Sequence, residues 1–166
     1  MKLIQRFFLA AAAALTLATA QAGALTDYAE NKIVDALLRG QALGAPATFH
    51  IGLDTVACTE AGGGTEVAGN NYARVAVTSS LANWAGTQSA GSTTASSGTS
   101  GTTSNNGAIT FPTPSASWGT VVSVRWWDAA SAGNAWMCVN LTTSKTINNG
   151  DTVSFPASSL SFQADN

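Results

Sequence analysis

The segment Gly119–Leu141 constrains the fold of this chain most strongly, because it predicts a β-hairpin. Its first arm, Val121–Trp127, is rich in β-branched and aromatic side chains, which favour a pleated, half-buried surface. The following Ser131–Asn134 supplies a residue pair that tolerates the positive φ of a tight turn. Trp136–Leu141 is again apolar and forms the returning arm. A chain organised around such a hairpin is expected to be rich in antiparallel sheet.

Two adjacent tryptophans in this hairpin raise the question of what covers them. Neighbouring residues on a strand point to opposite faces, so Trp126 and Trp127 cannot both enter the same core. One packs inward, and the other needs a second layer, a neighbouring subunit or a ligand. Exposed tryptophans on a β-sandwich often mark an interface or a sugar-stacking platform, whereas most tryptophans pack inside. The candidate interface or ligand-stacking residues are Trp84, Trp126, Trp127, Tyr72 and Arg74.

Short apolar segments separated by turn signals predict a mainly β fold, namely an antiparallel β-sandwich of roughly seven strands with one N-terminal helix. The helix is predicted over Leu25–Arg39, with Thr26 as its N-cap and Gly40 ending it in a left-handed conformation. Its apolar stripe is expected to bury itself against the end or face of a sheet. The predicted strands cover residues 47–54, 72–78, 108–111, 121–127, 136–141, 153–155 and 160–162.

The chain is expected to divide into an apolar leader, 1–22, and a single β-sandwich domain, 23–166, with a Ser/Thr/Gly-rich loop at 79–107. Lys2 and Arg6 precede an apolar run and an Ala-Gln-Ala site, which is the layout of a secretory signal peptide. The run is shorter than the span of about 20 residues that a membrane requires, so no stable membrane span is expected. The leader is therefore either cleaved or retained as an assembly helix.

The charge content argues against a nucleic-acid partner. Charged residues make up only 10% of the chain, against a typical share of about 25%, and the formal net charge is −2. Lysine and arginine occur singly, whereas nucleic-acid binding requires a clustered basic face. A neutral surface rich in hydroxyl groups is instead typical of extracellular or virion proteins.

The sequence offers no arrangement of residues typical of catalysis, and neither a cofactor nor a metal is expected. His50 is the only histidine, and no G-x-S-x-G elbow accompanies it. One histidine and two distant cysteines do not form a ligand cluster for zinc. The acidic residues Asp54, Glu60, Glu66 and Asp128 are interpreted as solvated loop charges rather than as a glycosidase pair.

Two local features leave structural alternatives open. Gly62–Gly64 lacks the Lys-Ser/Thr of a phosphate-binding loop and is interpreted as a tight connection between strands. Tyr72 and Arg74 share one face of a predicted strand, so Arg74 either stacks on an aromatic ring or pairs with Glu66.

The two cysteines, Cys58 and Cys138, are a possible disulfide. In an exported chain an even number of cysteines suggests a bridge, and two cysteines allow only one pairing. The alternative is that Cys138 is a small buried hydrophobic residue and Cys58 a free thiol in a loop.

An ordered series of short motifs resembles a family of small bacteriophage tail-fibre-type virion proteins. The resemblance covers about Ala24 to Phe162, and its most specific part is the block GGGTEV followed by YARVAV. The leader and the length of the loop 79–107 depart from that pattern, and so do the two cysteines, whose joint appearance favours their pairing. The motifs lie at Ala24–Tyr28, Pro46–Thr48, Gly62–Val67, Tyr72–Val77, Asn83–Trp84, Ile109–Pro112, Trp118–Val121, Trp127–Ala130 and Asn149–Asp151.

The resemblance implies a non-enzymatic virion structural protein, either a tail fibre or a head fibre or capsid-decoration subunit. It would assemble through its apolar strand and helix faces, with itself as a homotrimer and with other virion proteins, and a host-surface glycan is a further expected partner. The alternative is an exported carbohydrate-binding or adhesive β-sandwich module, secreted or periplasmic after leader cleavage.

Overall fold

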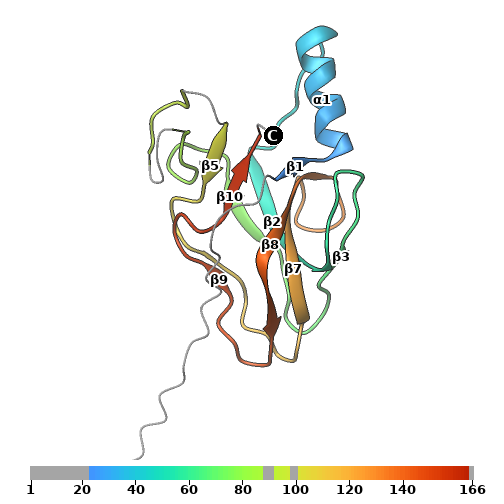
Figure 1. Cartoon of the computed structure of the whole chain (residues 1–166), viewed down its shortest axis with the longest axis vertical. Helices are drawn as coiled ribbons and strands as arrows, with labels where there is room; N and C mark the ends of the chain where they lie inside the picture. Colours follow the sequence, from blue (N-terminus) through green and yellow to red (C-terminus); the bar gives the residue numbers. More distant parts are fainter. Residues whose placement is uncertain (1–22, 88–91, 98–100, 165–166) are drawn as a thin grey trace, which may run out of the picture.

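The computed structural model describes residues 23–87, 92–97 and 101–164, and this part of the chain contains ten strands and one helix (Figure 1). The predicted class, mainly β with one N-terminal helix, is confirmed, and the larger number of strands comes from short ones. The unexpected strands are β1, β3 and β5, which have only two or three residues each and so carry no readable alternation. The elements are β1 Ala24–Leu25, α1 Asp27–Leu38, β2 Thr48–Val56, β3 Thr65–Glu66, β4 Val75–Thr78, β5 Thr102–Ser104, β6 Ile109–Thr110, β7 Gly119–Trp127, β8 Ala135–Ile147, β9 Ser154–Phe155 and β10 Ser161–Gln163.

The predicted hairpin, β7 and β8, lies at the centre of the main sheet. This sheet has the order β1-β8-β7-β2-β3, and β4 pairs with β2. All of its pairings are antiparallel. The hairpin turn places Ala132 and Gly133 at φ values of 50° and 75°, as a tight connection between twisted strands requires. The hairpin prediction is therefore confirmed, although β8 extends to Ile147 and absorbs a segment that was expected only to follow it.

The second layer consists of two small antiparallel sheets, β5–β10 and β6–β9 (Figure 1). One face of the main sheet packs against residues of this layer, which gives the fold its sandwich-like arrangement. Trp126 contacts Phe162 of β10, with ring centroids 6.3 Å apart, and both residues are buried. The core cluster joins Ile51, Leu53, Val67, Ile109, Phe111, Trp118, Val121, Val124, Trp126, Val139, Ile147, Val153, Phe155, Leu160 and Phe162.

Part of the segment expected to be a long polar loop belongs to this second layer. Asn105 is 1% exposed, and its side chain accepts a hydrogen bond from the backbone N–H of Leu160 at 2.8 Å. The same side chain donates to the carbonyl oxygens of Gly107 and Pro156. The oxygen and the nitrogen of this buried side-chain amide are both hydrogen-bonded. These bonds explain how the C-terminal part of a segment with few large apolar residues is ordered.

Helix α1 is attached to the sandwich by its first turn. The Thr26 hydroxyl accepts from the backbone N–H of Ala29 and lies 2.5 Å from the carbonyl oxygen of Ala135, to which it donates. Tyr28 meets Trp136 edge to face at 5.5 Å between ring centroids. The helix then extends beyond the end of the sheet (Figure 1). Gly40, at φ 68°, follows its C-terminus as predicted.

The expected burial of the helix stripe is wrong. Ala29 is the only buried residue of α1, whereas Val34, Leu37 and Leu38 are 49%, 76% and 82% exposed. The amphipathic pattern was sound, but it could not reveal that the helix axis points away from the sheet. In the described part of the chain no helix is both long and apolar enough to cross a membrane. The leader 1–22 lies outside the described residues.

Candidate functional site

A polar layer lies on the face of the main sheet that points away from the hydrophobic core. Strand alternation creates it, because β7 sends Val124 and Trp126 into the core and Ser123, Arg125 and Trp127 to the other face. The register of the three central strands then aligns these side chains with their neighbours. Gly52, Arg125 and Cys138 form one cross-strand row, and Asp54, Ser123 and Asn140 form the next.

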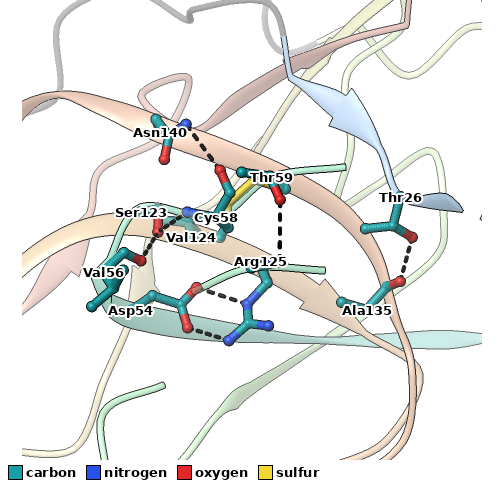
Figure 2. Close-up of a disulfide and its surroundings, with 12 residues drawn as sticks. Thr26, Asp54, Val56, Cys58, Thr59, Ser123, Val124, Arg125, Ala135 and Asn140 are labelled. Atoms are coloured by element: carbon teal, nitrogen blue, oxygen red, sulfur yellow. Dashed lines mark hydrogen bonds and ion pairs between the residues drawn. A yellow bond between two sulfur atoms is a disulfide. The ribbon is translucent and has the colours of Figure 1, made fainter. Parts of the chain in front are cut away.

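A disulfide between Cys58 and Cys138 ties a loop over this layer, as Figure 2 shows. The backbone N–H of Cys58 donates to Ser123 Oγ at 3.2 Å, and Asn140 Nδ2 donates to the carbonyl oxygen of Cys58 at 3.2 Å. The loop closes tightly at Gly64, which has a φ of 100°. A Cβ atom there would lie 3.3 Å from Arg125 Cζ. The glycine-rich segment is thus a strand connection that allows the backbone to approach the arginine.

Arg125 and Asp54 form a buried ion pair beneath this loop (Figure 2). Asp54 is 0% exposed and Arg125 5% exposed. Arg125 Nε donates to Asp54 Oδ2 at 2.8 Å, and Arg125 Nη2 donates to Asp54 Oδ1. Burial raises the pKa of Asp54, and the hydrogen bond and charge of Arg125 counteract only part of that rise. The interpretation of Asp54 as a solvated loop charge is wrong.

Trp127 is covered by two arginines of its own chain. Arg74 Cζ lies 3.8 Å and Arg125 Cζ 4.4 Å from the centroid of the indole ring, which are cation–π distances. Glycine at position 52 makes room for the indole, since a Cβ there would lie 2.9 Å from Trp127 Nε1. This cover, which belongs to the same chain, occupies the face that a stacked ligand would need.

Arg74 also pairs with Glu66, so both of the alternatives considered for it occur. Arg74 Nε donates to Glu66 Oε1 and Nη2 donates to Glu66 Oε2, each at 2.7 Å. Its third nitrogen, Nη1, donates to the carbonyl oxygens of Ala129 and Ala132 at 2.7 and 2.8 Å. One guanidinium group thereby links β3, the hairpin turn and the indole of Trp127.

Tyr72 connects this cluster to the core. Its hydroxyl donates to Glu66 Oε1 at 3.0 Å and accepts from the backbone N–H of Leu53 at 2.8 Å. Its ring meets Trp118 edge to face at 5.3 Å between centroids. Burial raises the pKa of Tyr72 far above its ordinary value, and Glu66 adds to the rise. The phenol therefore stays protonated and donates a fixed hydrogen bond.

We expect Arg74→Lys to lower the free energy of unfolding by about 2 kcal/mol, because an ammonium group cannot reproduce the bidentate pair with Glu66 and the two carbonyl bonds. Urea denaturation followed by tryptophan fluorescence measures the change. Arg39→Lys is the matched control, because Arg39 is exposed and its ion pair with Asp35 lies on the helix surface. Equal stability of the two variants would contradict a structural role for Arg74.

The remaining candidate aromatics, Trp84 and Trp126, lie on the core side and line an apolar pocket of about 470 Å³. Trp126 is 1% exposed and contributes a wall, while Leu81 is 54% exposed. The ring centroids of the two tryptophans are 6.3 Å apart. Among the residues that the structure describes, no charged side chain lines this pocket, which we call the aromatic pocket. Its lining is Phe49, Ser79, Ser80, Leu81, Trp84, Ala85, Gly86, Ser96, Thr103, Trp126, Met137 and Phe162.

The five candidate residues therefore do not form one site. Arg74 and Trp127 lie in the polar layer, and Trp84 and Trp126 line the aromatic pocket. The ring of Tyr72 packs against the core, and its hydroxyl reaches the polar layer through Glu66. Sequence reasoning missed Leu81, Phe49 and Met137 as pocket residues. The alternation of residues 47–54 indicated that Phe49 faces inward, but nothing in the sequence indicated that Leu81 would return to it.

The polar layer offers fixed charges rather than reactive groups. Its two arginines are both paired with carboxylates, at Glu66 and Asp54. Within residues 23–87, 92–97 and 101–164, no group of three or more His, Cys, Asp or Glu side chains is placed to hold a metal ion. What the arrangement can do is hold the loop, the hairpin turn and the sheet in one geometry.

Comparison with known proteins adds a family to this geometry. A family model described as podophage GP4 fiber I protein gp80 matches residues 24–163, which include every strand of the sandwich. No curated protein matches the chain.

Proposed function

The chain belongs to the family of podophage GP4 fiber I protein gp80, and on that premise we propose that it is a structural subunit of a phage fibre. The observation that carries the proposal is the extent of the match, which begins at the first strand and ends at the last. The family makes the chain a component of the virion. An exported or periplasmic protein finds no support in the family match.

The architecture is consistent with a mechanical role. The disulfide and two arginine–carboxylate pairs fix the loop and the turn on one face of the sheet, while the second layer covers the other. These buried, mutually bonded polar groups contribute rigidity and specificity of packing rather than chemistry. A fibre subunit, which transmits force without turnover, needs a domain of this kind, so we propose a non-enzymatic role.

The oligomeric state and position belong to the same proposal. Fibre subunits work as assemblies, and this chain leaves Leu37 and Leu38 of α1 largely exposed. Contact with another subunit would remove this apolar surface from water. We infer a homotrimer located in a tail fibre or head fibre, in contact with other virion proteins. A host-surface glycan stays a prediction as a further partner.

The experiment is to ask whether the chain is part of the particle. Phage particles are purified by density gradient from the culture that produces the chain and analysed by peptide mass spectrometry. Gold-labelled antibodies raised against residues 23–166 then place the chain on the tail or the head by electron microscopy. We expect a fixed number of copies per particle and gold on projecting fibres. Absence from gradient-purified particles, with the chain left in the lysate, would refute the proposal.

A further inference from the structure

The chain carries two exposed apolar surfaces of opposite shape. One is convex and consists of Val34, Leu37 and Leu38, which lie at helical spacing on one side of α1; we call it the helix ridge. The other is concave, the aromatic pocket of about 470 Å³. Its volume falls within the range that is typical of ligand-binding pockets in proteins. Neither surface has a partner among the described residues of this chain.

The helix ridge is held away from the body of its own chain. The hydroxyl of Thr26 is bonded to Ala135, and the ring of Tyr28 packs on Trp136, so the first turn is fixed in position and direction. The ridge begins almost two turns later, where α1 has extended beyond the sheet (Figure 1). None of the described residues of the chain therefore covers its apolar side.

The aromatic pocket lies close to the base of the same helix. Phe49, which lines the pocket, packs edge to face on Trp136 at 6.1 Å between ring centroids. Trp136 also contacts Tyr28 in the first turn of α1. The aromatic pocket and the helix that carries the ridge thus lie at one end of the molecule. Trp136 lies between Phe49 of the pocket and Tyr28 in the first turn of α1.

The chemistry of the pocket selects an apolar, uncharged occupant. Phe49, Met137 and Phe162 contribute apolar side chains, and its polar groups are the neutral hydroxyls of serine and threonine. Burying a charge here would have no compensating ion pair. Branched aliphatic side chains such as those of the ridge match this lining, and Leu81, more than half exposed, lies in the lining as an additional contact.

We propose that the helix ridge of one copy binds in the aromatic pocket of the next copy. The contact is heterologous, since it joins two different surfaces, and it therefore generates a closed ring or an open filament rather than a simple two-fold dimer. Each copy uses its ridge once and its pocket once. This inference rests on the proposed function and deepens it, because it names the partner surface of a fibre subunit.

The test uses one variant of the helix ridge and two variants of the aromatic pocket. Leu37→Asp with Leu38→Asp inactivates the ridge, and Leu81→Asp inactivates the pocket, with Ser80→Arg as a second pocket variant at an exposed position. Val56→Asp is the matched control, because Val56 is 53% exposed on β2 and belongs to neither surface. Circular dichroism and thermal melting establish that each variant is folded. The readout is mass by light scattering over a dilution series.

The ridge variant and the pocket variant are each expected to be monomeric, with association weakened on the order of 100-fold or more by the charges that replace buried leucine. The control keeps the mass of the unaltered chain. An equimolar mixture of the two variants is expected to form a 1:1 complex, because one supplies an intact pocket and the other an intact ridge.

Three results would overturn the proposal. A pocket variant that assembles like the unaltered chain would show that the ridge does not bind in the pocket. A mixture that stays monomeric would show that the two surfaces are not partners. Assembly lost on removal of residues 1–22 but kept in all three variants would show that the leader, and neither of these two surfaces, drives association. None of these results affects the presence of the chain in purified particles, so the fibre assignment is tested separately.

Discussion

Replacing Arg125 with methionine is expected to lower the free energy of unfolding by about 3–5 kcal/mol, because it leaves a buried carboxylate without a partner. Asp54 is 0% exposed, and its nearest cation is the guanidinium group of Arg125, which contacts both of its oxygens. The loss should therefore exceed that of an exposed arginine many times over. Guanidinium denaturation followed by tryptophan fluorescence gives the change directly.

The double variant Asp54→Leu with Arg125→Met separates the cost of the orphaned charge from the worth of the pair. Replacing both partners by apolar side chains removes the unpaired charge, so most of the lost stability should return. Arg39→Met provides the control for the substitution itself on an exposed arginine. If Arg125→Met costs no more than this control, the ion pair is not the stabilising contact that its geometry implies.

Removing the disulfide is the second large effect. Cys58→Ala with Cys138→Ala is expected to cost about 4 kcal/mol, because the bond closes a loop with a sequence separation of 80 residues. Cross-linking residues so far apart removes much of the conformational freedom of the unfolded chain. Alanine is chosen because both cysteines are buried, at 2% and 3% exposure. Chemical denaturation of the variant and of the intact protein measures the difference.

The control for the cysteine pair is the unaltered protein treated with a reductant. Mass spectrometry without reduction should show a chain two mass units lighter than after reduction, and the reduced protein should lose the same stability as the double variant. A protein that is fully reduced when isolated, or a double variant of undiminished stability, would contradict a structural disulfide.

The central sheet could be predicted from the sequence because strand alternation is a local pattern. Strand alternation placed Trp126 and Trp127 on opposite faces, and the structure shows one in the core and the other against Arg74. The same reasoning placed Arg74 within reach of an aromatic ring and of Glu66. Arg74 contacts both Glu66 and Trp127 because these two residues lie in β3 and β7, which both pair with β2.

What the sequence could not supply was the partner of each residue across the fold. Asp54 is the last residue of the predicted strand 47–54. It is buried and paired with Arg125 because β2 aligns with β7 and the loop of Cys58 covers both residues. Likewise, periodicity marks an apolar side of α1 but does not give the direction of the helix axis. The exposure of Leu37 and the position of Leu81 depend on long-range geometry that no local pattern encodes.

The central claim is that this chain is a self-assembling fibre subunit, and the most direct test is the mass of the purified full-length protein by light scattering over a wide dilution range. We expect three copies per assembly in solution, with a mass that does not fall on dilution and that falls to one copy when Leu37 and Leu38 are changed to aspartate. A well-folded monomer at every concentration would contradict it.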